Sequence, residues 1–204
     1  QEMPDLRPED NLWLRAPRPG VILQRGRARA YPTFAHDDYH FGLVTDGGLI
    51  TRRRGGEYFA RSGALTALHP AEAHSGRSST DAGWSYQLIV VDQRMIRAAL
   101  DALGASGDLY FPRLVISDDA LASGFQRAHM TLADPTSDLE FDEVLADVIN
   151  AFIERSEARS LLDDDADDRA ARVGGAPRTI CGELVARLAG AHGGRRQVSS
   201  CKSV

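Results

Sequence analysis

Long apolar runs and cysteine-rich stretches are both missing from this sequence of 204 residues. No segment approaches the ~20 consecutive apolar residues that a membrane-spanning helix needs, and the opening QEMPDLRPED is too polar for a secretory signal. The two cysteines, Cys181 and Cys201, are too few for a disulfide scaffold, so we expect reduced thiols. We therefore expect a cytoplasmic protein without a membrane partner, and the apolar content of 43% supports a sizeable core.

The signatures of several enzyme classes are absent as well. There is no P-loop, no dinucleotide-binding fingerprint and no nucleophile elbow. Ser75 follows His74, but a serine in a glycine-flanked turn more often shapes the turn than attacks a substrate. We interpret Glu72 as a solvated loop carboxylate and Arg52–Arg54 mainly as polar barrel exterior. The sequence therefore predicts no catalytic residues, and we expect that the protein is not an enzyme.

Charge is distributed unevenly along the chain, whose formal net charge is −5. Residues 169–204 are strongly basic, with Glu183 as their single acid, so the rest of the chain is acidic. Between the two regions, Asp163–Asp168 contains a run of aspartates that repel one another and favour a solvated segment. We predict one domain over 1–162, an acidic linker over 163–168 and a basic tail over 169–204.

The first half of the domain has the pattern of short β-strands. Apolar and polar residues alternate, and paired glycines at Gly47-Gly48 and Gly55-Gly56 mark tight turns. Short strands at regular spacing are typical of a barrel or sandwich. The predicted strands are Val21–Tyr31, Tyr39–Thr45, Leu49–Arg54, Glu57–Ala60, Ala64–Leu68 and Ser85–Val91.

Three helices are predicted to follow the strands. Asp92 caps the first, which Gly104 ends, and Ser117-Asp118-Asp119 begins the second. The third spans roughly Asp138–Arg159. Apolar residues recur at helical spacing over a wide face of each helix, so each must pack against another element. The fold class predicted for residues 1–162 is therefore α+β.

The order of these segments, with several local motifs, resembles the N-terminal effector-binding and dimerisation domain of the AraC family of bacterial transcription regulators. The likeness covers about residues 20–160. Its motifs are specific as an ordered set, whereas each motif alone is weak. The matching residues are His36-Asp37-Asp38-Tyr39, Phe41-Gly42, Gly47/Gly48, Arg54-Gly55, Ser62-Gly63, the run HPAEAHSG from His69 to Gly76, and Gly83-Trp84-Ser85-Tyr86.

The resemblance implies a cupin-like β-barrel, or double-stranded β-helix, followed by a small set of packed helices. It also implies a small-molecule effector inside the barrel, a homodimer formed through the helices, and DNA binding by a separate region. Aromatic and histidine side chains suit such a pocket, because apolar walls with a few polar groups bury and orient a ligand. The candidate effector-binding residues are Phe34, His36, Tyr39, Phe41, His74, Trp84 and Tyr86.

Three roles remain open for His36 and His74. They could hold a metal with His40, fix loops at the barrel mouth through hydrogen bonds, or donate hydrogen bonds to a polar effector. Metal-binding cupins place a histidine where this chain has Phe34, and the glutamate that follows in them is also missing. We therefore expect no cofactor, with a metal at His36, His40 and His74 as the alternative.

The basic tail resembles the truncated start of a helix-turn-helix DNA-binding domain. Glu183–Gly190 is similar to the first helix of such a unit and its turn, but the residues that follow have no apolar face for a recognition helix. We expect the sensing and dimerisation portion of an AraC-family regulator that does not by itself bind an operator specifically. The alternatives are a stand-alone metal-dependent cupin enzyme, an oxygenase or isomerase, and a carbohydrate-binding cupin.

Overall fold

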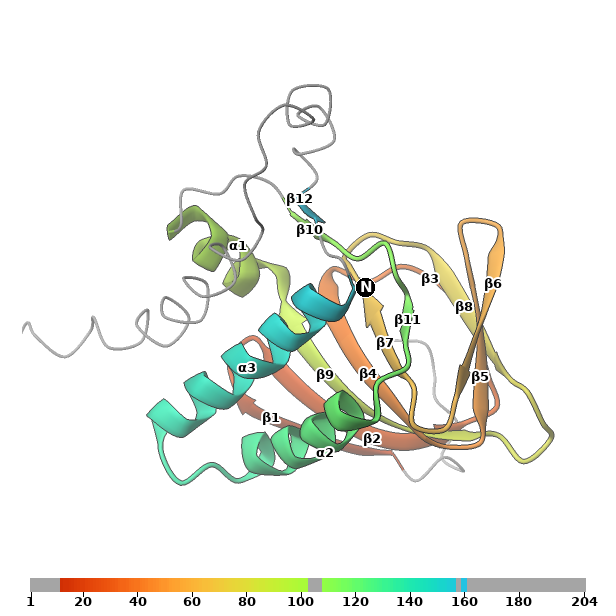
Figure 1. Cartoon of the computed structure of the whole chain (residues 1–204), viewed down its shortest axis with the longest axis horizontal. Coiled ribbons are helices and arrows are strands. Elements are labelled where there is room, and N and C mark those ends of the chain that lie inside the picture. Colours follow the sequence, from red (N-terminus) through yellow and green to blue (C-terminus); the bar gives the residue numbers. More distant parts are fainter. Residues whose placement is uncertain (1–11, 103–107, 157–158, 161–204) are drawn as a thin grey trace, which may run out of the picture.

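The computed structural model describes residues 12–102, 108–156 and 159–160. Two antiparallel sheets face each other and enclose the barrel interior (Figure 1). One sheet has six strands, in the order β1 (Trp13–Arg18), β2 (Val21–Ala28), β9 (Trp84–Asp92), β4 (Asp38–Asp46), β7 (Leu65–Leu68) and β11 (Val115–Ile116). The other has four, in the order β3 (Ala30–Phe34), β8 (His74–Ser78), β5 (Gly48–Arg53) and β6 (Gly56–Arg61).

The helices follow the barrel strands, and two of them cover the outer face of the six-stranded sheet. They are α1 (Gln93–Ala102), α2 (Asp119–Ala133) and α3 (Asp138–Ser156). In Figure 1, α2 and α3 lie across β1, β2, β9 and β4, while α1 projects from the end of β9. The two covering helices close the main hydrophobic core. In this core the ring of Phe152 contacts those of Phe41 of β4 and Phe125 of α2.

Strand alternation gives the six-stranded sheet two different faces. On β4, Phe41 points to the helices and is fully buried, whereas His40 and Gly42 border the barrel interior. Its neighbour β9 pairs in register, with Ile89 opposite Phe41 and Leu88 opposite Gly42. The helix face of the sheet is therefore densely packed, and the other face forms a wall of the interior.

The α+β class and the barrel-then-helices order are confirmed. The predicted caps are also present, because the Arg94 amide donates to Asp92 (2.7 Å) and the Leu121 amide donates to Asp118 (2.9 Å). The hairpin turn between β5 and β6 is shifted by one residue from its predicted place. Its central residues are Arg54 and Gly55, both with positive φ, as a two-residue turn of this kind requires.

Two strands of the barrel, β1 and β8, were not among those predicted from the sequence, and the single strand predicted over Val21–Tyr31 is divided between β2 and β3, which lie in different sheets. A third unpredicted feature is the segment 108–116 between α1 and α2, which carries β10 (Leu109–Tyr110) and β11. β10 pairs with β12 (Arg159–Ser160). The predicted linker 163–168 and basic tail 169–204 lie outside the described residues and stay predictions. No helix in the described ranges is long and apolar enough to cross a membrane.

Candidate ligand-binding cavity

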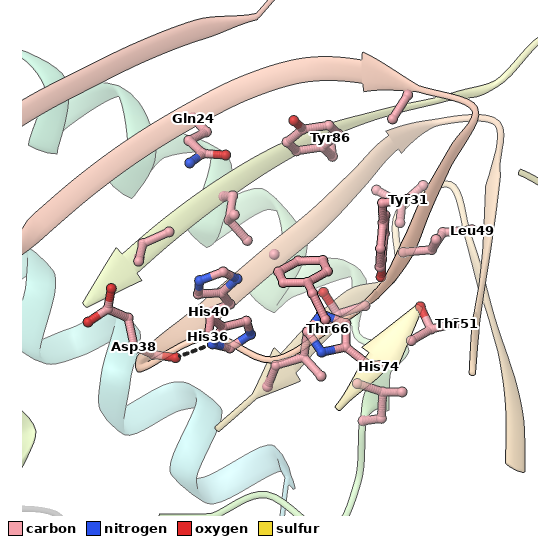
Figure 2. Close-up of a pocket in the computed structure, with 18 of the residues that line it drawn as sticks. Gln24, Tyr31, His36, Asp38, His40, Leu49, Thr51, Thr66, His74 and Tyr86 are labelled. Atoms are coloured by element: carbon pink, nitrogen blue, oxygen red, sulfur yellow. Dashed lines mark hydrogen bonds between the residues drawn. The ribbon is translucent and has the colours of Figure 1, made fainter. Parts of the chain in front are cut away.

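A cavity of about 520 Å³ lies between the two sheets. Its volume falls within the roughly 300–1,000 Å³ typical of small-molecule sites. In Figure 2, His36 and His40 lie one above the other beside Asp38, while Tyr31 and Thr51 project from the four-stranded sheet. The cavity therefore has a histidine end on one side and hydroxyl groups on the other.

The tautomer of His36 follows from its hydrogen bond. The side chain precedes β4, and its Nδ1 lies 2.6 Å from the carbonyl oxygen of Asp38. A carbonyl can only accept, so Nδ1 carries the proton and Nε2 has the free lone pair. This Nε2 is buried, and no group in the described part of the chain hydrogen-bonds to it. His36 thus offers an unused acceptor at the cavity.

His74, at the start of β8, has the same arrangement. Its Nδ1 lies 2.9 Å from the carbonyl oxygen of Glu72, so a neutral ring again has its lone pair on Nε2. The His36 and His74 ring centroids are 5.1 Å apart. Burial, and for His36 the proximity of His74, lowers the pKa of both imidazoles, that of His36 to about 4. Both rings are therefore neutral at pH 7.

His40 does not complete a metal site with these two rings. Its ring stacks on that of His36 at 3.5 Å between centroids and 8° between planes. Ring nitrogens in parallel stacked planes do not converge on one point, whereas a metal needs its ligands to converge. Within the described residues, no three His, Cys, Asp or Glu side chains are grouped so that they could hold a metal ion. Burial lowers the pKa of His40 well below its ordinary value.

Two glycines make room in the walls of this cavity. A Cβ on Gly76 of β8 would lie 2.3 Å from the ring of Tyr31, so only glycine lets this tyrosine lie against the strand. A Cβ on Gly42 of β4 would lie 2.5 Å from the Thr66 hydroxyl oxygen. Burial raises the pKa of Tyr31 to about 12, although its hydrogen bond with Thr51 lowers it. Tyr31 therefore contributes a neutral hydroxyl to the cavity wall, where its ring lies 5.7 Å from that of His74.

A second polar cluster lies next to the cavity and consists of the buried residues Arg53, His69 and Glu72 and the exposed Arg54. Glu72 was predicted to be solvated, and that prediction is wrong, because only 6% of the residue is exposed. Its carboxylate lies 3.0 Å from Arg53 Nη1 and 2.7 Å from Arg54 Nε. Arg53 was assigned to the barrel exterior but is buried too, and it also donates to the carbonyl oxygens of Phe111 and Pro112. The cluster ties β5 to the segment 108–116.

The family assignment rests on the length of the match to a family model. A model described as the AraC-like ligand binding domain matches residues 18–149, more than half of the chain. The chain belongs to the family of AraC-like ligand-binding domains. None of the curated proteins compared with the chain is a significant match.

Solved structures similar to this AraC-like domain include a regulator and cupins. The AraC-like transcriptional activator CuxR is 13% identical, with a TM-score of 0.54 over 90% of this chain and 74% of that one. A cupin 2 conserved barrel domain protein from Salinispora arenicola is 17% identical, with a TM-score of 0.38 over 44% and 82%. A putative mannose-6-phosphate isomerase from Ralstonia eutropha is 12% identical, with a TM-score of 0.38 over 43% and 88%. At these identities the likeness is one of fold alone, and the likeness to CuxR agrees with a barrel followed by helices.

The AraC-like domain brings most of the candidate effector-binding residues to one cavity. Those that line it are Phe34, His36, His74, Trp84 and Tyr86. Tyr39 and Phe41 do not line it, which corrects their assignment. They occupy the alternate positions of β4 that face the helices, where the Tyr39 hydroxyl accepts from the Leu109 amide at 3.0 Å. An effector-binding role for the five lining residues stays a prediction.

Several cavity residues of the AraC-like domain were not predicted from the sequence. They come from strands that were correctly located or from segment 108–116, and they include Gln24, Tyr31, Thr51, Thr66 and Leu114. For Gln24 a signal existed, because it is the one polar residue on the face of β2 that also holds Ile22, Gly26 and Ala28. Leu114 reaches the cavity from a segment without periodic pattern, so no sequence signal marks it.

Proposed function

We propose that this chain is the ligand-sensing portion of an AraC-family transcription regulator, which binds a small-molecule effector between the two sheets. The observation that carries the proposal is the unused lone pair of His36 Nε2, buried at a cavity large enough for a small molecule. A buried polar atom without a partner costs stability, so its retention needs an explanation such as a ligand. Membership of the AraC-like ligand-binding domains supports the same function.

Segment 108–116 supports a route by which a bound effector acts on the rest of the regulator. Leu114 of this segment lines the cavity, and Arg53 holds the backbone of the two residues that precede Arg113. The same segment carries β10, whose partner β12 lies just before the predicted linker. A ligand that displaces Leu114 would therefore shift segment 108–116 and with it β12, which is paired with β10. A shift of β12 would move the start of the linker, and so change how a dimer presents its DNA-binding regions.

The test of ligand binding is a thermal-shift screen of small molecules of every charge class. Binding in the cavity raises the unfolding temperature of the wild type, because a ligand of the folded state stabilises it. Thr66→Trp fills the cavity and should abolish the shift, whereas Phe59→Trp adds the same ring on the outer face of β6, where Phe59 is exposed. Leu88→Trp replaces Thr66→Trp if that variant does not fold. A screen without any compound whose shift depends on the open cavity would refute the proposed function.

We further propose a cytoplasmic homodimer that uses the helices for its interface. Met130 of α2 and Leu139 of α3 are each 58% exposed, which supports an apolar contact on this side of the molecule. Sedimentation velocity should show a dimer for the wild type and a monomer for the Met130→Lys/Leu139→Lys variant. A wild type that stays monomeric at every concentration tested would refute the dimer.

We also propose that the chain is not an enzyme and holds no resident metal. The rival function, a metal-dependent cupin oxygenase or isomerase, would use His36, His74 and His40, but the stacking of His40 on His36 disfavours a shared ion. Metal analysis of protein purified without added metal separates the two functions. Stoichiometric iron or nickel that is lost in the His36→Ala/His74→Ala variant would favour the enzyme.

A further inference from the structure

The nature of the effector can be narrowed from the hydrogen-bonding groups of the cavity. At the histidine end, His36 and His74 each use Nδ1–H on a backbone carbonyl and keep a lone pair on Nε2. Both rings therefore accept hydrogen bonds and do not donate them to a ligand. Of the three roles that the sequence left open for these histidines, donation of hydrogen bonds to an effector does not agree with this hydrogen bonding. A ligand that satisfies them must bring its own O–H or N–H groups.

The charges around the cavity point in the same direction. Among the described residues that line it, none is Lys or Arg, and the charged ones are the aspartates Asp37 and Asp38. A carboxylate or phosphate would therefore meet lone pairs and negative charge without a cation to compensate, in a partly enclosed space where burying a charge is costly. Because burial keeps the imidazoles neutral at pH 7, they do not supply that cation.

Most of the remaining wall is apolar and aromatic. Phe34 and Tyr31 lie against His74, with ring centroids 4.9 and 5.7 Å from its ring, and Trp84 packs on Tyr31 at 6.0 Å. Leu88 and Val90 of β9 line the opposite wall. Such walls favour a ligand with a hydrophobic body, because transfer of apolar surface from water to an apolar site is favourable. Polar groups of the wall, such as the hydroxyls of Thr51 and Thr66 and the amide of Gln87, lie among these apolar residues, so a ligand with both a hydrophobic body and a few polar groups fits best.

We propose that the cavity selects an uncharged small molecule with a hydrophobic ring body and two neighbouring hydrogen-bond donors, which bind Nε2 of His36 and of His74. The two ring centroids are 5.1 Å apart, a separation that adjacent hydroxyl or N–H groups of one molecule can span, and a small rotation of the His36 side chain would bring its buried Nε2 to the ligand. Anions of the same size are rejected at neutral pH. This inference rests on the proposed sensing function and specifies the class of ligand.

Four probes that differ in hydrogen-bond donors, charge and hydrophobic body test the proposal by calorimetry at pH 7.0. They are 2,3-dihydroxynaphthalene, with two donors; 2,3-dimethoxynaphthalene, without donors; 2-naphthalenesulfonate, an anion; and myo-inositol, which has donors but no hydrophobic body. We expect the dihydroxy compound to bind at least about tenfold more tightly than each of the others, since one lost hydrogen bond to a buried group costs about 1–3 kcal/mol. Its binding should disappear in Thr66→Trp and persist in Phe59→Trp.

Variants of His36 test which atom recognises the donors. His36→Phe keeps a ring of similar shape but removes the lone pair, so the affinity for 2,3-dihydroxynaphthalene should fall about tenfold while that for 2,3-dimethoxynaphthalene stays within about twofold. His36→Gln restores an acceptor and should recover part of the affinity. Circular dichroism and the unfolding transition of each variant establish that it is folded. An equal loss for both probes would mean that His36 only shapes the cavity, which overturns the proposal.

The other outcomes separate this inference from the sensing function. If the sulfonate or myo-inositol binds most tightly, and Thr66→Trp abolishes that binding, the ligand class is wrong while the sensing function stands. If none of the four probes binds, the ligand class is also wrong. The sensing function is then decided by the wider thermal-shift screen. A compound of any class whose shift depends on the open cavity supports the sensing function, and a screen without such a compound refutes both the sensing function and the ligand class.

Discussion

Glu72 and His74 are two residues apart, yet they belong to two polar clusters that are built differently. In the Glu72 cluster, charges are paired across 2.7–3.0 Å and Arg53 also reaches two backbone carbonyls. In the His74 cluster, the neutral rings of His36 and His74 each bind a backbone carbonyl through Nδ1, and no described group hydrogen-bonds to the buried Nε2 of His36. The first cluster connects parts of the fold, and the second leaves recognition groups beside an open space. If the proposed function is correct, the first cluster serves stability and the second serves ligand binding, and the two can be separated by substitution.

The largest effect on stability is expected for a substitution in the Glu72 cluster. Glu72→Gln removes the charge that compensates Arg53, which is 3% exposed, and should destabilise the protein by about 3–5 kcal/mol because an unpaired buried charge is costly. Urea unfolding followed by circular dichroism measures the loss. The Arg53→Met/Glu72→Gln double variant should lose less than the sum of the two single variants, because their effects are coupled. A loss below about 1 kcal/mol in Glu72→Gln would contradict a structural role for the pair.

Two adjacent residues of β9 allow a similar comparison between the packed core and the cavity wall. Ile89 is fully buried under the helices, and Ile89→Ala should cost about 2–5 kcal/mol because it leaves a hole in a packed core. Leu88 borders the cavity, where the space beside it is already open, so Leu88→Ala should cost less than about 1 kcal/mol. Chemical denaturation of both variants gives the two values. Equal losses would show that the cavity side is packed as tightly as the helix side.

Acid should weaken the fold through the histidine cluster. His36 has an ordinary pKa of 6.5 when unfolded and about 4 when folded, chiefly because burial disfavours the charged ring. Between these values the unfolded chain holds more protons, so the contribution is complete above pH 6.5 and is lost as the pH falls toward 4. For His36 alone the loss is about 1–3 kcal/mol.

Thermal unfolding from pH 8 to pH 4 measures this dependence. Burial lowers the pKa of His40, His69, His74 and His129 too, so the wild type should lose more than the amount due to His36. His36→Phe should flatten the profile between pH 6.5 and 4, and a profile unchanged by this substitution would mean that His36 does not titrate as described.

The smallest effect is expected for His36→Phe at pH 7.5 without ligand. The variant loses the hydrogen bond to Asp38 but no longer buries a lone pair without a partner, so its unfolding free energy should change by less than about 1 kcal/mol. The same equilibrium unfolding measurement applies. A loss as large as that of Glu72→Gln would place His36 among the residues that hold the fold together, and the comparison between the clusters would fail.

Local patterns were enough to predict most elements of this fold. The strands around β4 and β9 alternate, and the helices begin at aspartates whose oxygens accept the expected amide hydrogens. β1 (WLRAPR) and β8 (HSGRS) escaped prediction because neither alternates and β8 contains a glycine. They are strands because of their partners, which is a property of the folded sheet.

The candidate site was predictable only in part, because long-range contacts decide it. Aromatic and histidine residues near His74 marked the right region, but alternation alone did not tell which face of β4 borders the cavity, and Tyr39 and Phe41 were placed on the wrong one. Glu72 looked solvated because its partner Arg53 is far away in the sequence. The proton positions of His36 and His74 depend on backbone carbonyls that only the folded loops bring close.

The alternation of β4 and β9 also bears on how such a protein changes over generations. Neighbouring positions such as Leu88 and Ile89 face different compartments, so a substitution that reshapes the cavity need not disturb the layer on which the helices rest. A few replacements at every second position of these strands can therefore give the cavity a new shape over generations. The packing between the sheet and its helices stays the same while the cavity changes.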